Sequence, residues 1–185
     1  PRFIGRNPSG LASPGRFYDA IQQIARDHKS DPIAAVFIQE HNLRFSNDKM
    51  FRDWARRRHH ILWLARYRPA AEVGGHGHGT AVAIPLDMIE RKENETQNQA
   101  EARVTRSLTG SKCGRVTAVR TLVGGKPVKL VSAYAPSKGV HRPAFFRNSL
   151  DPHLTKNTVL SIDANCVPDV VLDTQRPSAV GEYDN

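Results

Sequence analysis

The chain has 185 residues, a formal net charge of +9 and a pI near 10.0. Hydrophobic residues make up 39% and charged residues 24%, a composition that suits one folded domain over residues 1–185 and excludes a disordered chain. No apolar run approaches the roughly 20 residues of a membrane-spanning helix. Two cysteines, Cys113 and Cys166, cannot build a disulfide framework or a four-thiolate zinc site.

Helices and strands are expected to alternate along the first half of the chain. Ser13 can cap a helix whose first residue is Pro14, and apolar residues recur at helical spacing to about His28. The continuous apolar run Ile33–Ile38 predicts a strand that is buried on both faces. The other elements expected in this half are a strand over residues 2–5, a helix capped by Ser46 over residues 46–54, and strands over residues 61–64 and 80–84.

The second half is expected to contain a loop, a hairpin, a helix and a strand. Residues 91–101 are polar and predict an exposed loop. Two runs of strand character, residues 115–123 and 127–134, flank the turn sequence Gly124-Gly125-Lys126 and predict a hairpin. A helix over residues 142–154 and a buried strand over residues 158–162 complete the set. This order of elements predicts an α/β fold with a mixed sheet.

The positive charge is concentrated in one segment. Residues 102–150 contain ten of the 27 basic residues and no acidic residue, whereas the remaining 17 basic residues nearly balance 18 acidic ones. A polyanion such as nucleic acid is the functional interpretation of such a segment, and a basic surface that only aids solubility is the alternative. The basic side chains predicted to contact nucleic acid are Arg115, Arg120, Lys138 and Arg142.

Polar side chains follow the predicted strands at their carboxyl ends. Glu40 comes after Ile33–Ile38, Asp163 and Asn165 come after residues 158–162, and Asn7 follows the first strand. Ligands of open α/β sheets gather at the carboxyl ends of strands, and carboxylate and amide oxygens are the ligands that Mg²⁺ prefers. The four side chains therefore predict a metal site if these strand ends converge. The alternative is that Asp and Asn stand there as turn formers.

A series of short motifs occurs along nearly the whole chain. They are Asn-x-x-Gly-Leu from Asn7, Ile-Gln-Glu ending at Glu40, a glycine-rich turn into Thr80-Ala-Val-Ala-Ile, Arg115-Val, Val-Ser-Ala-Tyr-Ala-Pro around Tyr134, and Asp-Ala-Asn-Cys-Val from Asp163. In this order, the motifs resemble the endonuclease/exonuclease/phosphatase superfamily. Within it, they are most similar to the apurinic-type endonuclease domains of non-LTR, LINE-type retrotransposons.

The resemblance implies a fold, a chemistry and a set of roles. The fold is a DNase I-like, four-layered α/β sandwich of two mixed sheets flanked by helices, and the chemistry is phosphodiester hydrolysis with Mg²⁺ or Mn²⁺. Glu40 would bind the metal with Asn7 beside it, and Asp163 would orient or deprotonate the attacking water. Asn165 would hold the phosphate or the water, and Tyr134 would hydrogen-bond a phosphate oxygen. A divalent ion would neutralise the charge that develops on the phosphoryl group.

The sequence departs from the family in two places. First, Ile162 stands where the family has glycine before the Asp-x-Asn motif. Second, the family's catalytic histidine belongs to a Ser-Asp-His motif that is expected beyond Asn165, and the domain is expected to be truncated before its last strands, so that this motif is missing. The leading hypothesis is a DNA-nicking endonuclease, intracellular and by family nuclear, with a reverse transcriptase in the same polyprotein. The alternatives are an inactive, truncated remnant that binds nucleic acid, and a phosphatase or phosphodiesterase of the same superfamily.

Overall fold

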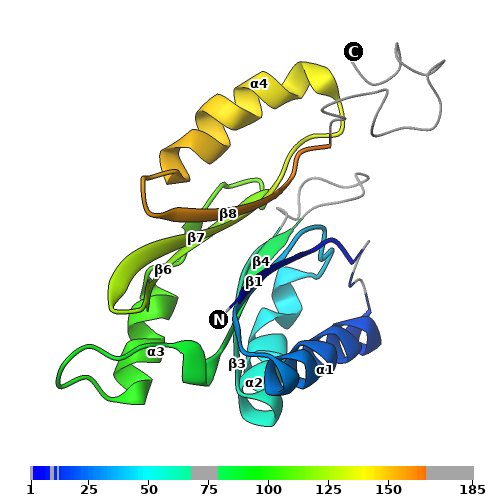
Figure 1. Cartoon of the computed structure of the whole chain (residues 1–185). Helices are drawn as coiled ribbons and strands as arrows, with labels where there is room; N and C mark the ends of the chain where they lie inside the picture. The colour runs from blue at the N-terminus through cyan, green and yellow to red at the C-terminus, as the bar shows by residue number, and fades with distance from the viewer. Residues whose placement is uncertain (1, 9–10, 12, 68–78, 166–185) are drawn as a thin grey trace.

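Two four-stranded β-sheets form the centre of the molecule (Figure 1). The computed structural model describes residues 2–8, 11, 13–67 and 79–165. The first sheet, sheet A, has the strand order β1-β2-β4-β3, and the second, sheet B, has the order β5-β6-β7-β8. The strands are β1 (Arg2–Arg6), β2 (Ile33–Ile38), β3 (Ile61–Arg66), β4 (Thr80–Pro85), β5 (Thr109–Gly110), β6 (Val116–Val123), β7 (Lys126–Tyr134) and β8 (Thr158–Asp163).

Each sheet contains one parallel pair of strands. In sheet A, β1 runs parallel to β2, and the register pairs Arg6 with Ile38. In sheet B, β7 runs parallel to β8, and the register pairs Tyr134 with Asp163. The other neighbours in both sheets are antiparallel. The carboxyl ends of β1 and β2 therefore lie side by side in sheet A, and those of β7 and β8 lie side by side in sheet B. A hydrogen bond between Asn7 and Asp163 shows that these two pairs of strand ends are adjacent.

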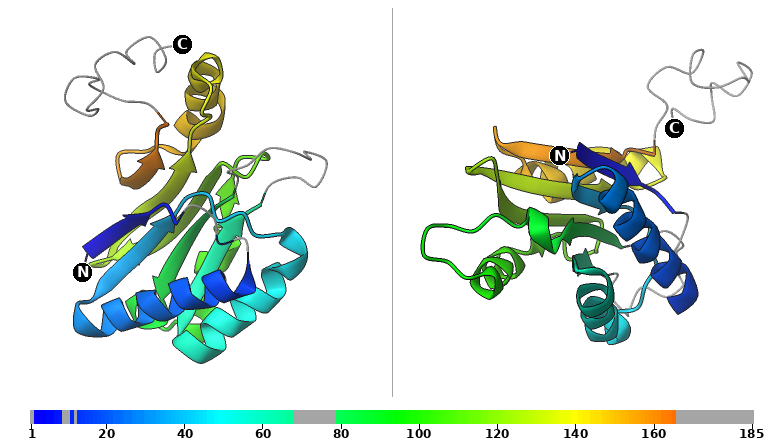
Figure 2. Two further views of the ribbon diagram at one scale, coloured as in Figure 1. Left: turned by 90° about the vertical axis from the view of Figure 1, so that its right-hand side faces the viewer. Right: turned by 60° about the horizontal axis from the view of Figure 1, so that its bottom comes forward.

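Helices cover the outer face of sheet A. The described part of the chain has the helices α1 (Pro14–Ser30), α2 (Asp48–His59), α3 (Gln97–Arg106) and α4 (Arg142–Phe145), of which α1 and α2 form this layer. Figure 2 shows α1 and α2 side by side below the strands of sheet A. Phe17 and Phe51, from these two helices, pack in one buried cluster with Trp63 of β3. The Phe17 ring meets the Trp63 ring edge to face at 5.0 Å between centroids. Burial of aromatic surface thus fastens this helical layer to sheet A.

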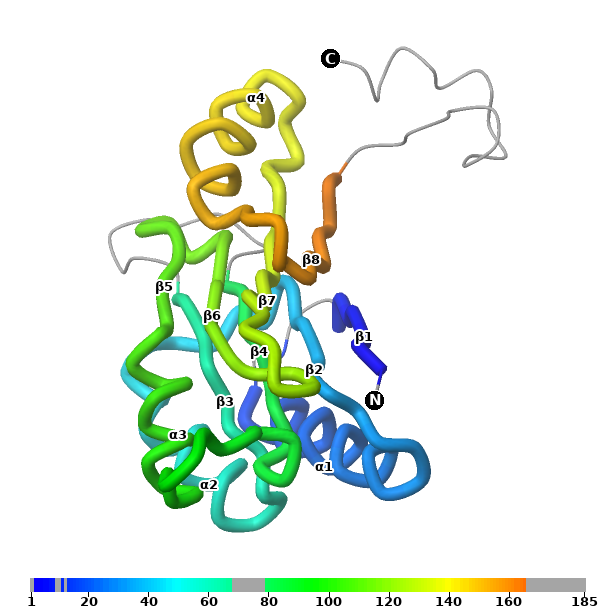
Figure 3. The backbone as a smooth tube through the Cα atoms, turned by 60° about the vertical axis from the view of Figure 1, so that its left-hand side comes forward, coloured from blue at the N-terminus to red at the C-terminus, as the bar shows by residue number. Residues whose placement is uncertain are grey.

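The inner face of sheet A packs on sheet B, and α4 covers the other side of sheet B. Phe37 and Leu64 of sheet A share a buried cluster with Val119 and Leu130 of sheet B. On the opposite face of β6 and β7, four small apolar side chains pack against Phe145 and Leu150. These two residues belong to the segment that begins with α4 and continues as a π-helical turn, whose course Figure 3 shows. The layers are helix, sheet, sheet and helix, so the predicted four-layered sandwich of two mixed sheets is confirmed.

Several predicted elements have the expected position, with differences at their ends. Ser13 caps α1, since its Oγ accepts a hydrogen bond from the backbone N–H of Arg16 at 3.3 Å. The second helix begins later than predicted, because residues 45–47 form a 3₁₀ turn and Asn47 rather than Ser46 occupies the N-cap. The predicted helix over residues 142–154 is present but irregular, with a π-helical turn and a 3₁₀ turn after α4.

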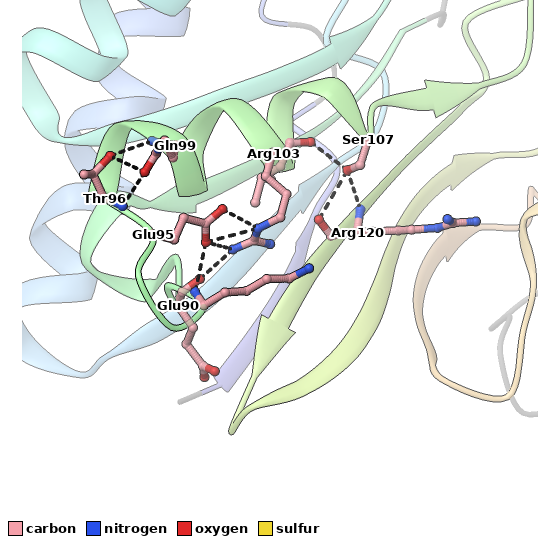
Figure 4. Close-up of polar contacts among 9 residues, drawn as sticks. Glu90, Glu95, Thr96, Gln99, Arg103, Ser107 and Arg120 are labelled. Carbon is pink, nitrogen blue, oxygen red and sulfur yellow. Dashed lines mark hydrogen bonds and ion pairs between the residues drawn. The ribbon is translucent and has the colours of Figure 1, made fainter.

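The loop prediction for residues 91–101 is wrong from Gln97 onward, because α3 begins there, whereas residues 91–96 form a mostly exposed loop as expected. Thr96 and Gln99 form a capping box at the start of α3, in which each side chain binds the backbone N–H of the other (Figure 4). Ala100 and Val104 lie one turn apart and are fully buried between the sheets. The Thr-x-x-Gln sequence that forms this capping box is a helix-start signal that can be read from the sequence. The helix was missed because only a narrow apolar face, with Ala100 and Val104, interrupts an otherwise polar segment. In the described ranges, no helix is long and apolar enough to cross a membrane.

Candidate functional site

The predicted site residues lie together where sheets A and B meet. Asn7 follows β1, Glu40 lies two residues after β2, Tyr134 ends β7 and Asp163 ends β8. The side-chain amide of Asn7 donates a hydrogen bond from Nδ2 to Oδ2 of Asp163 at 2.7 Å. This bond joins residues that are 156 positions apart and links sheet A to sheet B. The convergence of strand ends that the metal-site prediction required is therefore present.

Asp163 is held through both of its carboxylate oxygens. While Oδ2 accepts from Asn7, Oδ1 accepts from the backbone N–H of Asn165 at 3.0 Å. Asn165 has a left-handed backbone, with φ of 49°, and its Nδ2 donates to the carbonyl of Ala135 at 2.6 Å. Asparagine tolerates this conformation better than most residues. The turn after β8 thereby fixes both the aspartate and the amide at the end of β7.

Tyr134 connects the groups of the two sheets. Its side chain is buried, with 7% of the residue exposed, and its hydroxyl lies close enough to Glu40, Asn165 and Asp163 for all three to influence its pKa. Burial, followed by the hydrogen bond to the Glu40 carboxylate, raises the pKa of Tyr134 to about 12. The phenol is therefore protonated at neutral pH and can act as a hydrogen-bond donor. A substrate oxygen placed nearby could accept the same hydrogen bond.

A buried amide behind Glu40 joins the two sheets and was not predicted from the sequence. Gln39 is 3% exposed, and its Nε2 lies 3.2 Å from Oγ of Ser132, 3.3 Å from Oγ of Ser161 and 3.4 Å from the Ser161 carbonyl oxygen. Ser132 in turn donates to the carbonyl of Ile38 at 3.0 Å. Glu40, the next residue, has a left-handed φ of 53°. We call Gln39, Ser132 and Ser161 the inter-sheet bridge.

The sequence held one signal for this bridge. Gln39 directly follows six apolar residues of a strand that is buried on both faces, so a polar side chain there needs buried partners. Its backbone N–H also donates to the carbonyl of Arg6 at 3.1 Å, which continues the pairing of β1 with β2. The bridge therefore fixes the backbone that presents Glu40.

Three of the four predicted nucleic-acid contacts lie near the end of β7. The Arg115 guanidinium carbon is 5.2 Å from the centroid of the Tyr134 ring, and its Nη1 donates to the carbonyls of Tyr134 and Ala135. Arg142 donates to the carbonyls of Pro136 and Ser137 at 3.2 and 2.9 Å, and Lys138 is exposed on the same loop. Arg115 and Arg142 thus also brace the backbone beside the site.

Arg120 lies elsewhere. It is exposed on β6 and pairs in register with Lys129, whereas the site end of the same ladder is the pair Val116 and Ala133. Four residues along a strand correspond to about 13 Å. The four basic residues therefore do not form one cluster.

The oxygen donors at the site suit a hard divalent cation. Glu40 and Asp163 supply carboxylates, and the Oδ1 of Asn7 is the amide atom not used in the bond to Asp163. In the described part of the chain, no three His, Cys, Asp or Glu side chains gather closely enough to hold a metal by themselves. Mg²⁺ is commonly held by one or two carboxylates and completes its shell with water and substrate phosphate. The donor set fits that pattern and does not fit a closed structural metal site.

His41 follows Glu40 but serves the core rather than the site. Its Nε2 donates to the carbonyl of Arg66 at 3.0 Å, and its Nδ1 accepts from the backbone N–H of Leu43 at 3.0 Å. Complete burial lowers the pKa of His41 to about 4, against the opposing effect of its backbone hydrogen bonds. The imidazole is therefore neutral at physiological pH, and both nitrogens are used in holding the loop after β2.

Comparison with solved structures finds similar folds at low sequence identity. The endonuclease domain of TRAS1, a telomere-specific non-LTR retrotransposon, is 14% identical with a TM-score of 0.43, over 89% of this chain and 59% of that one. D. rerio TDP2, complexed with a single strand DNA product, is 11% identical with a TM-score of 0.49, over 90% and 61%. An endonuclease/exonuclease/phosphatase family protein from Leptotrichia buccalis C-1013-b is 12% identical with a TM-score of 0.44, over 89% and 65%.

The chain spans about three fifths of the length of these structures. At such identities the likeness concerns the fold alone. Searches of the sequence against family models and against curated proteins find no match.

Proposed function

We propose that this chain carries the site of a divalent-metal-dependent endonuclease that hydrolyses one strand of DNA. The observation that supports this most directly is the convergence of Asn7, Glu40, Tyr134, Asp163 and Asn165 from four strand ends on two sheets. Turn formers at unrelated strand ends would have no reason to hydrogen-bond across the sheets. A cluster of two carboxylates, two amides and one phenol matches the needs of phosphodiester hydrolysis.

Glu40 would hold the metal, with the Oδ1 of Asn7 beside it. Bound Mg²⁺ or Mn²⁺ would polarise a phosphoryl oxygen and neutralise the charge that develops in the transition state. Glu40 can take this role because the inter-sheet bridge fixes the backbone that presents its carboxylate. The hydrogen bond from Nδ2 to Asp163 holds the Asn7 side chain at this strand end.

Asp163 would orient the attacking water and accept its proton. Its carboxylate is positioned by donors on both oxygens, so its orientation is fixed before substrate binds. The protonated phenol of Tyr134 would donate a hydrogen bond to a phosphate oxygen, and the amide of Asn165 lies at the same end of β7 to hold the phosphate or the water. All of these groups act from rigid strand ends rather than from long loops.

DNA is the substrate that the charge favours. The segment over residues 102–150, which has no acidic residue, contains the site residue Tyr134. It also supplies three basic residues near Tyr134, namely Arg115, Lys138 and Arg142. Neutralisation of phosphates by Lys and Arg supplies most non-specific affinity for nucleic acid. The apurinic or retrotransposon type, a nuclear location and a reverse transcriptase in the same polyprotein belong to this proposal through the sequence resemblance.

The decisive experiment is nicking of supercoiled plasmid by the protein, with Mg²⁺ and with chelator. We expect chelator-sensitive nicking that falls by a factor on the order of 10²–10⁴ in Glu40→Gln and in Asp163→Asn. Asp19→Asn, on α1, and Glu93→Gln, in the loop before α3, remove exposed carboxylates that are not among the proposed site residues, and both variants should retain the wild-type rate. Wild-type nicking by the site variants would refute the site. Hydrolysis of a phosphomonoester without any plasmid nicking would refute the endonuclease and indicate a phosphatase.

A further inference from the structure

A pair of basic side chains lies on the outer face of sheet B beyond the part that α4 covers. The register of β6 and β7 pairs Val116 with Ala133, Ala118 with Val131 and Arg120 with Lys129, in that order from the site end. The first two pairs pack against Phe145 and Leu150. Because side chains alternate along a strand, Arg120 and Lys129 lie on the same face as these apolar pairs, in the next row.

Neither of these cations is neutralised within the described residues. Arg103, on neighbouring α3, donates to both oxygens of Glu95 and to the carbonyl of Glu90, and this contact holds the pKa of Glu95 down to about 2. Arg120 differs, because its side chain extends away from that network (Figure 4). In the described ranges, no carboxylate forms an ion pair with Arg120 or Lys129.

The backbone at Arg120 is hydrogen-bonded to a side chain of the neighbouring segment, although its guanidinium forms no ion pair with the part of the chain that the structure describes. The hydroxyl of Ser107 accepts from the Arg120 N–H at 2.8 Å and lies 2.6 Å from the Val104 carbonyl and 3.2 Å from the Arg120 carbonyl, to either of which it can donate. Ser107 therefore occupies the edge of β6 at Arg120, where another strand would pair (Figure 4). On the other strand, the N–H of Lys129 donates to the carbonyl of Asn157 at 2.9 Å. This bond brings the turn that carries exposed Lys156 next to Lys129.

The pairing of two like charges on adjacent strands has a cost. Opposed like charges destabilise a sheet, and here burial and the charge of Arg120 both lower the pKa of Lys129. Burial and Lys129 likewise lower the pKa of His153, at the end of the helical segment that begins with α4. Since none of the ion pairs in the described ranges includes Arg120 or Lys129, no salt bridge there relieves the repulsion in this row. A bound anion would relieve it.

We propose that Arg120, Lys129 and Lys156 form a second contact for the phosphate backbone of nucleic acid, separate from the strand-end site. Tyr134 and Lys129 are five residues apart on β7, or about 17 Å along the strand. That length corresponds to about five base pairs at 3.4 Å per pair. The contact therefore takes phosphates away from the bond that is cut, or those of a second nucleic-acid segment. It shares with the proposed function the expectation that the chain binds nucleic acid, but it does not depend on cleavage.

The test removes the paired charges and measures binding in the presence of chelator. The double variant Arg120→Gln/Lys129→Gln is compared with Arg57→Gln/Arg58→Gln, which removes two exposed charges from α2 on the other side of the molecule. Binding to a DNA duplex of about 40 base pairs and to an RNA duplex of the same length is followed from about 50 to 200 mM salt. We expect the slope of log affinity against log salt to shrink by about 1.8 in the first variant for DNA, and less in the control.

Each other outcome has a defined meaning. Equal slopes in the two double variants, or loss of binding only to vesicles of anionic phospholipid, would overturn the second contact. A shift for RNA alone would identify RNA as its ligand. The melting temperature of the first variant should equal or exceed that of the wild type, because repulsion is removed, so a fold defect would be visible separately. If the wild-type protein does not nick plasmid but the two double variants still differ in slope as expected, the proposed function is refuted and the second contact stands.

Discussion

The inter-sheet bridge gives a prediction about stability that can be worked from the structure. Gln39→Leu keeps the size of a buried side chain but removes the amide that faces Ser132 and Ser161. The substitution removes the amide donor that faces the Ser132 hydroxyl, the Ser161 hydroxyl and the Ser161 carbonyl oxygen. The Ser132 hydroxyl still donates its own hydrogen bond to the Ile38 carbonyl. Loss of a buried hydrogen-bond partner costs about 1–3 kcal/mol. We therefore expect the free energy of unfolding to fall by about 2 kcal/mol, which lowers the melting temperature of a chain this long by roughly 4–8 °C.

Gln39→Glu should be worse than Gln39→Leu, although it is closer in shape. A carboxylate only accepts hydrogen bonds, and it would face the carbonyl oxygen of Ser161 in a buried position. The assay is urea unfolding followed by tryptophan fluorescence, because Trp63 is fully buried in the core of sheet A. Gln22→Leu, on the exposed face of α1, is the matched control and should stay within about 0.5 kcal/mol of the wild type. A Gln39→Leu protein as stable as this control, or a Glu variant more stable than the Leu variant, would refute the bridge.

Two further predictions concern His41 and the start of α3. Since the pKa of His41 is about 4 when folded and 6.5 in the reference state, the unfolded chain binds more protons between these pH values. Stability should therefore fall by on the order of 2 kcal/mol from pH 7 to pH 5, and urea unfolding of His41→Gln should lack this component of the slope. Thr96→Ala removes the acceptor that binds the N–H of Gln99 at 3.3 Å and should cost about 1 kcal/mol. Thermal denaturation should show a loss of roughly 2–4 °C, and Thr96→Ser should restore the wild-type value.

The strand predictions are confirmed for buried and for partly exposed strands alike. The strand over residues 158–162 is present as β8, but it is only partly buried and not buried as predicted. Ile33–Ile38 is buried at every position, so its continuous apolar run carries a clear signal. The failure at α3 has the opposite cause. That helix buries only three of its ten residues, and one of them is Glu101, whose carboxylate pairs with Arg56 at 2.7 Å. A charged residue that is buried by pairing with a distant partner cannot be recognised from local composition.

The sequence alone indicated the types of group at the candidate site, because Glu40, Tyr134, Asp163 and the two asparagines stand at strand ends in a recognisable order. Tertiary structure decided that these ends meet, through the bond from Asn7 to Asp163 and the contact of Tyr134 with Glu40. It also separated Arg120 from the other basic residues, which the sequence had grouped by proximity along the chain. The physical reason is that local patterning determines which face of a strand is buried, whereas pairing between strands and packing between sheets determine which distant side chains come into contact.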